Sequence, residues 1–248
     1  MTEGSTAPAI CFDATGTLIE ATASVGEVYH HVACAHGVDL PAWRLDDAFR
    51  RVLRHAPPRG LEGATRDERR ANEVEWWFER IRQTFQAADS SARFDDFRSF
   101  ARVLFDRYES GEAWRARPGI RETLLRLNDL DSFLAVTSNF DHRLPKILEA
   151  LDLDHFFSIM EIPFQEARAK PERSVFESVA QAAGRPIDSL VYVGDDPPEI
   201  LRALTTHGLR VVDIGEVQES ATLFDLLLGP SKSTAPATLP STTPTIDP

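Results

Sequence analysis

The chain has 248 residues, of which 42% are hydrophobic, and a formal net charge of −12 at pH 7. This length allows one large domain, or one domain carrying an insertion, and the hydrophobic fraction is enough for a sizeable core. The acidic balance disfavours nucleic acids and anionic membrane surfaces as partners, and two cysteines, Cys11 and Cys34, are too few for a disulfide framework or a cysteine-rich zinc site.

The two ends of the chain differ in amino-acid composition from its middle. Residues 1–8 are small and polar, and residues 229–248 are rich in Pro, Ser and Thr, so we expect both segments to be disordered. No membrane-spanning run and no signal peptide is evident. We therefore expect a cytoplasmic protein. The oligomeric state does not follow from the sequence.

The first ordered element is a short apolar run, Ala9-Ile-Cys-Phe, which ends at Asp13. Its length and the turn residues after it predict a buried strand. From residue 22 to residue 113 the hydrophobic spacing is helical, with helices expected at 24–37, 45–55, 65–86 and 94–108. We expect residues 22–113 to form a helical unit inserted after the first strand.

From residue 114 to residue 228 helices and strands alternate. We expect strands at 133–137, 157–162, 190–193 and 210–214, and helices at 118–128, 141–151, 171–183, 197–206 and 217–228, with Asp141 as an N-cap. Repeated β-α units predict a parallel sheet with right-handed crossovers. Residues 9–21 and 114–228 would therefore form one Rossmann-like α/β core, with helices on both faces of the sheet.

Polar groups follow three of the predicted strands. Asp13 ends the first, Ser138-Asn139 follows the second, and Asp195-Asp196 follows the strand at 190–193. Parallel strands present these ends at one edge of the sheet, where ligands bind. Carboxylates gathered there would repel one another unless a cation lay between them, and oxygen ligands suit Mg²⁺.

Two further residues suit an anion at this edge. Gly16, in the turn after Asp13, allows the backbone to approach an anion closely. Lys170 immediately precedes a predicted helix, where its charge opposes the helix dipole. We therefore expect another group, such as a carboxylate or a bound phosphoryl group, to hold Lys170, although a solvated loop lysine is an equally simple interpretation.

These positions resemble the motifs of the haloacid dehalogenase-like (HAD) hydrolase superfamily. The matching residues, in order, are Asp13-Ala-Thr15-Gly16-Thr-Leu, Ser138, Lys170-Pro171 and Gly194-Asp195. The helical insertion resembles the C1 cap of that superfamily. The run Val136 to Leu144 is most similar to the group of HAD-like domain-containing protein 3 (Reg-2-like).

The resemblance implies a phosphatase mechanism. Asp13 would attack phosphorus and form an aspartyl-phosphate. Mg²⁺ would be held by Asp13, Asp195 and the backbone carbonyl of Thr15, and Ser138 and Lys170 would bind the transferring oxygens. Thr15, Gly16 and Asn139 would complete the substrate site, and the substrate would be a small phosphorylated metabolite.

The chain departs from the family pattern at two positions. Thr15 stands where phosphatases of this superfamily usually carry a second aspartate, the general acid and base. A threonine hydroxyl cannot titrate near neutral pH, and such catalysis typically contributes 10²–10⁴-fold. Candidate substitutes near the first helix of the insertion are Glu20, His30 and His31, each also readily explained as a solvated surface residue.

The second departure lies in the acidic motif. Where the family places another aspartate, this chain has Glu199 and Ile200. Asp196 and Glu199 are possible outer acids of a metal site. Equally, Asp196-Pro-Pro-Glu199 has the spacing of a helix capping box.

Three functions are compatible with the sequence. The first is a Mg²⁺-dependent phosphatase, the second a HAD domain that binds a ligand or partner without turnover, and the third a haloacid dehalogenase-type hydrolase. Within the helical insertion, we expect Arg50, Arg51, Arg54, Arg59 and Arg66 to form a solvated face, and Trp76, Trp77 and Phe78 to lie in its core rather than to contact substrate.

Overall fold

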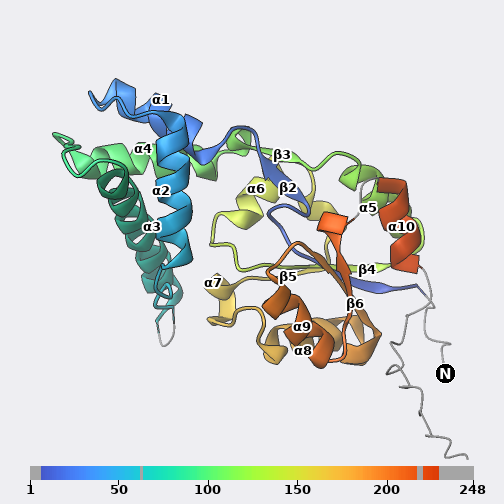
Figure 1. Cartoon of the computed structure of the whole chain (residues 1–248). Helices are drawn as coiled ribbons and strands as arrows, with labels where there is room; N and C mark the ends of the chain where they lie inside the picture. The colour runs from blue at the N-terminus through green and yellow to red at the C-terminus, as the bar shows by residue number, and fades with distance from the viewer. Residues whose placement is uncertain (1–6, 62–63, 217–219, 229–248) are drawn as a thin grey trace, which may run out of the picture.

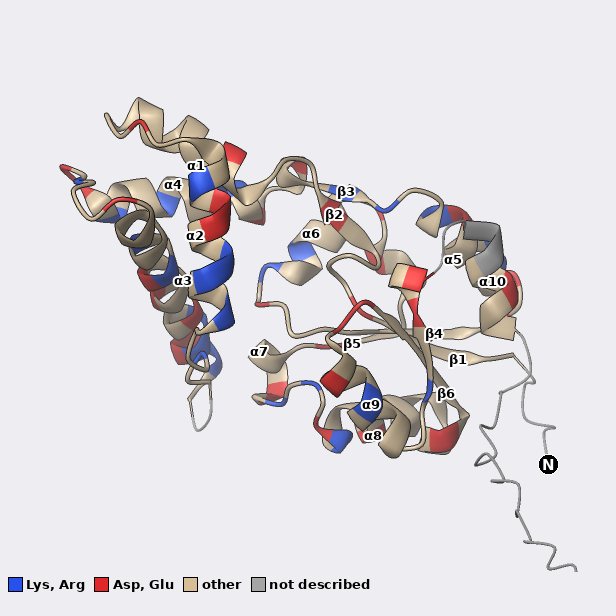
Figure 2. Cartoon of the chain, viewed as in Figure 1, with Lys and Arg blue, Asp and Glu red and all other residues tan. Residues whose placement is uncertain are grey.

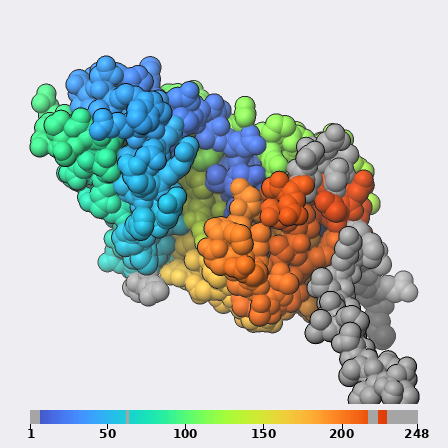
Figure 3. Space-filling model, viewed as in Figure 1, coloured from blue at the N-terminus to red at the C-terminus, as the bar shows by residue number. Residues whose placement is uncertain are grey.

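A computed structural model describes residues 7–61, 64–216 and 220–228. The predicted disordered segments, 229–248 and most of 1–8, lie outside these residues. Two units are visible in Figure 1, a helical unit and a unit built on a parallel sheet. In Figure 3 the helical unit, coloured blue to green, abuts the yellow and orange sheet unit.

The predicted Rossmann-like α/β core is confirmed. Its five-stranded sheet has the order β5-β4-β1-β6-β7, and every adjacent pair is parallel. The strands are β1 (Ala9–Phe12), β4 (Phe133–Thr137), β5 (Ile159–Glu161), β6 (Leu190–Gly194) and β7 (Arg210–Asp213).

Helices cover both faces of this sheet, because alternate residues of each strand point to opposite sides. Ile10 and Phe12 pack against α5, α6 and α10, whereas Ala9 and Cys11 pack against α8 and α9. These helices are α5 (Ile120–Asn128), α6 (Leu144–Ala150), α8 (Arg173–Ala183), α9 (Pro198–Thr206) and α10 (Ser220–Leu228), with a short α7 (Pro163–Glu166) after β5.

The helical unit has a separate hydrophobic core. Its helices are α1 (Val25–Ala35), α2 (Ala42–Arg54), α3 (Arg66–Ala88) and α4 (Phe97–Glu109). Capping boxes begin α1 at Ser24 and α3 at Thr65, which supply hydrogen-bond acceptors for otherwise unpaired backbone N–H groups. Tyr29, Phe85 and Phe100 lie in its centre.

Two short strands, which the sequence pattern did not predict, connect the units. They are β2 (Ile19–Ala21) and β3 (Trp114–Ala116), and they pair antiparallel. They bring the entry and exit of the helical unit together at one point of the sheet unit (Figure 1). Among the described residues, no helix is both long and apolar enough to cross a membrane.

Candidate active site

The sheet brings the predicted strand-end residues to one edge. Phe12 of β1 pairs with Val136 of β4 on one side and with Val193 of β6 on the other. Asp13, Ser138 and Asp195 follow these three strands, so they share the carboxyl edge of the sheet. This is the arrangement that the alternation of helices and strands predicts.

Lys170 is the centre of a buried charge cluster at this edge. Its side chain is 1% exposed, and Nζ lies 2.8 Å from Asp13 Oδ1 and 2.8 Å from Asp196 Oδ2. The expectation that a carboxylate holds Lys170 is therefore confirmed. Two carboxylates on one ammonium leave the cluster with an excess of negative charge.

Tyr192 belongs to this cluster and is a residue that sequence reasoning missed. Its hydroxyl accepts a hydrogen bond of 2.5 Å from Lys170 Nζ and donates one to the Asp196 carboxylate. Burial and the nearby Asp13 carboxylate raise its pKa, so the phenol stays protonated. A Cβ at Gly194 would lie 2.7 Å from this hydroxyl, so a glycine is needed there. The sequence feature that could have identified Tyr192 is a tyrosine in an otherwise apolar strand, two residues before Gly194-Asp195.

The turn after Asp13 lies directly against Asp195. Gly16 has φ +81°, and a Cβ there would be 2.1 Å from Asp195 Oδ2, so both conformation and space require glycine. The Thr17 hydroxyl is 3.5 Å from Asp195 Oδ1. The carbonyls of Ala14 and Gly16 accept hydrogen bonds from within the chain, whereas that of Thr15 accepts none from the described residues.

Two carboxylates of this edge, Asp13 and Asp195, have raised pKa values. Burial raises the pKa of Asp13, and Asp196 adds to this, although Lys170 opposes it. Partial burial raises the pKa of Asp195, although the residue is exposed at its outer side, and repulsion from Asp13 and Asp196 adds to this. Each carboxylate therefore resists ionisation in the absence of a further positive charge.

The Asn139 side chain positions Lys170 by binding the main chain of Lys170. Its Oδ1 accepts a hydrogen bond of 2.8 Å from the Lys170 backbone N–H, and its Nδ2 donates one of 3.0 Å to the Lys170 carbonyl. Both ends of the Asn139 amide are thus occupied. Ser138 differs, because within the described part of the chain its Oγ accepts only from the Phe140 N–H, at 3.3 Å, which leaves the hydroxyl proton for a ligand.

The sequence pattern predicted Asp141 as the N-cap of the next helix, and this prediction is wrong. The helix begins at Leu144, and the Asp141 carboxylate instead binds Arg143, with distances of 2.9 Å to Nε and 2.6 Å to Nη2. It also accepts a 2.6 Å hydrogen bond from Trp77 Nε1 of α3. Burial opposes ionisation here, but Arg143 outweighs it and lowers the pKa of Asp141 to about 2.

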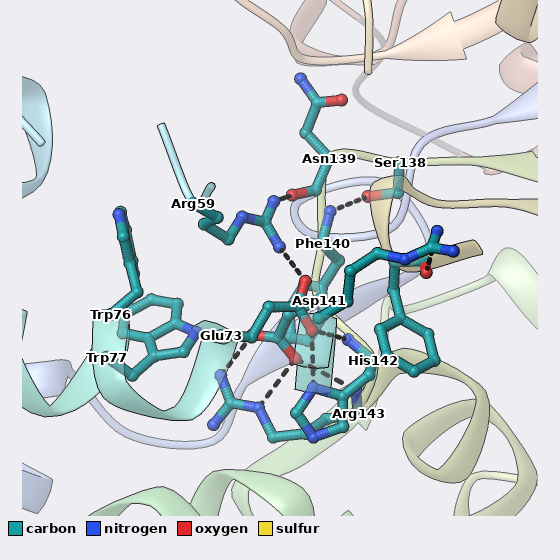
Figure 4. Close-up of polar contacts among 12 residues, drawn as sticks. Arg59, Glu73, Trp76, Trp77, Ser138, Asn139, Phe140, Asp141, His142 and Arg143 are labelled. Carbon is teal, nitrogen blue, oxygen red and sulfur yellow. Dashed lines mark hydrogen bonds and ion pairs between the residues drawn. The ribbon is translucent and has the colours of Figure 1, made fainter. Parts of the chain in front are cut away.

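A second polar contact ties α3 to the same loop (Figure 4). Glu73, which is fully buried, accepts hydrogen bonds from the His142 backbone N–H at 2.9 Å and from Nδ1 of its ring at 2.6 Å. Arg59 donates to Glu73 Oε1 at 2.9 Å and also to the Asn139 carbonyl. We call Arg59, Glu73, Trp77, Asp141 and His142 the clasp. It joins the helical unit to the loop that carries Ser138.

The capping-box interpretation of Asp196 and Glu199 is wrong. The N-cap of α9 is Pro197, without a side-chain cap, and the Asp196 carboxylate is taken up by Lys170 and Tyr192. Pairing with the buried ammonium outweighs a local cap, because desolvating an unpaired charge costs far more. Glu199 is exposed and forms no hydrogen bond or ion pair with another described residue.

The three candidate substitutes for the missing acid lie elsewhere. Glu20 pairs with Arg115 across the β2–β3 ribbon at 3.1 Å, and His30 hydrogen-bonds the Leu40 carbonyl at 2.9 Å. His31 is exposed on α1. None of the three lines the cavity that Asp13 faces.

A cavity of about 470 Å³ lies between the helical unit and the edge that carries Asp13. Asp13, Thr15, Ser138 and Lys170 line one part of it. Trp76, Trp77 and Arg59 line it too. The expectations of a solvated Arg59 and of Trp76 in the helical core are wrong. Trp77 lines the cavity and also packs against that core, so its prediction is confirmed in part. The helical spacing of α3 shows that one face is buried, but not that part of this face meets a cavity rather than packed side chains.

The remaining expectations for the helical unit hold. Phe78 is buried in its core. Arg50, Arg51 and Arg54 are exposed on α2, as the basic positions along that helix in Figure 2 illustrate. Arg66 is also exposed, with its guanidinium 5.5 Å from the ring centroid of Phe164 in α7.

The chain belongs to the haloacid dehalogenase-like hydrolases, whose family model matches residues 7–205. It is similar to haloacid dehalogenase-like hydrolase domain-containing protein 3 of Xenopus laevis, with 29% identity over 191 residues that cover 75% of each chain. The Danio rerio protein of that name is 30% identical over 189 residues, covering 75% of this chain and 76% of its own.

Solved structures with two different chemistries share the fold. A predicted phosphoglycolate phosphatase from Haemophilus somnus has a TM-score of 0.55 and 21% identity, covering 83% of this chain and 84% of its own. A dehalogenase solved with an intermediate complex has a TM-score of 0.62 and 17% identity, covering 93% and 100%. At these identities the likeness concerns the fold, and the chemistry must be argued from the site.

Proposed function

We propose that this hydrolase is a Mg²⁺-dependent phosphatase that acts on a small phosphorylated metabolite through an aspartyl-phosphate at Asp13. The observation that carries the proposal is that three carboxylates, those of Asp13, Asp195 and Asp196, lie close enough at one edge to repel one another, while the Lys170 ammonium pairs with only Asp13 and Asp196. Reciprocal repulsion of this kind is relieved by a divalent cation. The position of Asp195 against the turn at Gly16 supports the metal-dependent phosphatase over a metal-free hydrolase.

The residues present fit a magnesium ion. Asp13 and Asp195 offer carboxylate oxygens, and the Thr15 carbonyl is left without a partner among the described residues. Hard oxygen ligands of this type, completed by water and a phosphate oxygen, suit Mg²⁺. When bound, the ion would neutralise charge on the transferring phosphoryl group. Asp196 is an outer acid, because its carboxylate holds Lys170 and Tyr192.

Three side chains carry the transfer in this proposal. The Asp13 carboxylate attacks phosphorus, and Lys170, which donates to Asp13 Oδ1, fixes the orientation of the nucleophile. The Ser138 hydroxyl, with its proton free, donates to an oxygen of the transferring group. Thr15 and Gly16 form the turn that borders the phosphate, and Asn139 holds Lys170 in place. Water then cleaves the acyl phosphate and restores the carboxylate.

In this proposal, no residue of the protein is assigned as a proton donor to the leaving group. Thr15 cannot titrate, and neither Glu20, His30 nor His31 lines the cavity. We therefore propose an enzyme that is slow on poor leaving groups and faster on activated ones. The alternative of a non-catalytic binding domain rests on this same absence of an acid.

We further propose that residues 22–113 are a C1 cap that closes over the core formed by residues 9–21 and 114–228. The cavity between the two units supports this assignment. The cytoplasmic location stays a prediction from the sequence. A haloacid dehalogenase-type reaction, in which Asp13 would attack carbon, is the remaining alternative, and the non-acidic Thr15 is compatible with it.

The test is the hydrolysis of 4-nitrophenyl phosphate, an ester whose leaving group needs little protonation. We expect turnover with Mg²⁺, loss of turnover with a chelator, and loss of turnover in Asp13→Asn. Asp95→Asn, at an exposed position of the helical unit, is the control and should behave as wild type. Turnover in pure, folded Asp13→Asn would exclude Asp13 as the nucleophile. No turnover of this ester, together with chloride release from a 2-haloacid, would favour the dehalogenase.

A further inference from the structure

The lining of the cavity combines polar and apolar side chains. Asp13, Thr15, Ser138, Lys170 and Asp196 line the part where the phosphoryl group is proposed to bind, and the paired charges of Asp141 and Arg143 line the cavity beside Trp77. The remainder is largely aromatic and aliphatic. It is lined by Tyr29, Phe49, Leu53, Trp76, Trp77 and Trp114. A volume of about 470 Å³ lies within the range of small-molecule sites, about 300–1,000 Å³, so the cavity can hold much more than a phosphate.

Each cation of the lining already has a carboxylate partner. Lys170 is paired with Asp13 and Asp196. The Arg59 guanidinium lies 2.9 Å from Glu73.

Arg143 also has a carboxylate partner, because its guanidinium lies 2.6 Å from the Asp141 carboxylate. Arg80, which stacks 5.1 Å from the Trp76 ring centroid, does not line the cavity. Among the described lining residues, no cation is left to bind a second anionic group of a substrate.

We propose that the substrate is a phosphate monoester whose alcohol portion is bulky, uncharged and predominantly apolar, and that this portion lies against Trp76 and Trp77. This inference rests on the proposed phosphatase function and specifies its substrate class. Burying apolar surface against these rings is favourable, because it removes that surface from water. Burying a carboxylate or several hydroxyls there without partners is unfavourable. Carboxylated phosphates and sugar phosphates therefore fit this cavity poorly.

The test uses binding alone, with wild-type protein, Mg²⁺ and three phosphonates that cannot be hydrolysed. They share the phosphonate and differ in the far end of the molecule: propylphosphonate, 3-phosphonopropionate and 3-(2-naphthyl)propylphosphonate. Isothermal titration calorimetry should show the naphthyl compound binding at least tenfold more tightly than propylphosphonate. The carboxylate compound should bind no more tightly than propylphosphonate.

Two matched substitutions locate the effect. Trp76→Ala should remove most of the naphthyl advantage while leaving propylphosphonate binding within about twofold of wild type. Trp43→Ala makes the same change at a residue that is 71% exposed on α2 and does not line the cavity, so it should retain the naphthyl advantage.

The inference is overturned by equal binding of the naphthyl and propyl compounds, by tighter binding of the carboxylate compound, by an unchanged advantage in Trp76→Ala, or by no binding of any of the three. Its failure is distinct from that of the phosphatase proposal. Naphthyl-selective binding without Asp13-dependent turnover would refute the phosphatase and leave the cavity assignment standing. Turnover of 4-nitrophenyl phosphate without naphthyl selectivity would refute the cavity assignment and leave the phosphatase proposal standing.

Discussion

In the proposed phosphatase, we expect the catalytic rate to depend most directly on Thr15, which stands where the family usually has an acid. Its side chain is exposed in the turn after Asp13 and lines the cavity. Thr15→Asp would place a titratable group beside the leaving group, where general acid catalysis typically contributes about 10²–10⁴-fold. We expect Thr15→Asp to raise kcat for alkyl phosphates more than for 4-nitrophenyl phosphate, since only alkoxide leaving groups need the proton.

The isosteric control for this change is Thr15→Asn, which alters shape in the same way but carries no acidic proton. It should leave kcat for alkyl phosphates unchanged. An equal kcat in Thr15→Asp and Thr15→Asn would mean that proton transfer to the leaving group does not limit turnover.

The raised pKa of Asp13 has a consequence for stability. Burial disfavours its charged form, so the folded state holds the proton to higher pH than the unfolded state, in which the pKa is about 3.9. Asp13 therefore lowers the free energy of unfolding as pH rises from about 4 to its folded pKa, by about 1.4 kcal/mol for each pH unit in that window. The sign is opposite to that of a salt-bridged aspartate whose pKa is lowered.

Asp13→Asn removes this destabilisation. Without metal, urea denaturation should give the variant a higher free energy of unfolding than wild type at pH 7.5, and a much smaller difference at pH 4.5. A variant that is less stable than wild type at pH 7.5 would show that the attraction of Lys170 outweighs the burial of Asp13.

At the scale of elements, α3 and the loop after β4 depend on each other through the clasp. Glu73 of α3 is fully buried and binds both Arg59 and His142, from the segment before α3 and from the loop after β4. Glu73→Gln leaves the Arg59 guanidinium, whose side chain is 17% exposed, without its buried anion. Breaking a buried ion pair from one side costs about 3–5 kcal/mol. We expect a loss of this order in the free energy of unfolding.

The matched control lies two residues further along the same helix. Glu75 pairs with Arg98 at the surface, where ion pairs contribute about 0–1 kcal/mol, so Glu75→Gln should change stability by less than about 1 kcal/mol. Because the clasp also holds the loop of Ser138, Glu73→Gln should raise KM for aryl phosphates, whereas Glu75→Gln should not. Similar stability of the two variants in urea would contradict the structural role of the clasp.

At the scale of the whole molecule, the proposed metal ligands come from distant parts of the chain. Asp13 and Asp195 are brought together only by the pairing of β1 with β6, so the unfolded chain lacks the site. A ligand that binds only the folded state stabilises it by about 2.7 kcal/mol at a concentration of 100 times its Kd. We expect saturating Mg²⁺ to raise Tm relative to chelator. Asp195→Asn should abolish this increase and Asp95→Asn should retain it; an undiminished increase in Asp195→Asn would place the ion elsewhere.

Much of the sheet edge could be predicted from the sequence. Short apolar runs, each followed by a polar residue and then by a helix, imply parallel strands whose ends share one edge. This inference needs only the neighbours of each residue along the chain, which is why Asp13, Ser138 and Asp195 could be located. Gly16 could be located for the same reason, since its turn follows its strand directly.

Other features were decided by tertiary structure. Asp141 has the sequence of an N-cap, but the guanidinium of Arg143 and the indole of Trp77 outweigh that local preference. Helical spacing shows that one face of α3 is buried but not what it faces, so the cavity lining at Trp76 could not be predicted.

The α/β core, the helical insertion and the order of the strand-end residues could be predicted from the sequence, because each depends on local periodicity and on the handedness of β-α connections. The pairing of charges, such as Lys170 with Asp13 and Arg59 with Glu73, and the residues opposite Asp13 across the cavity became evident from the folded structure alone. A buried charge takes the partner that lies nearest in space, and residues far apart in the chain come within that distance only when the chain folds.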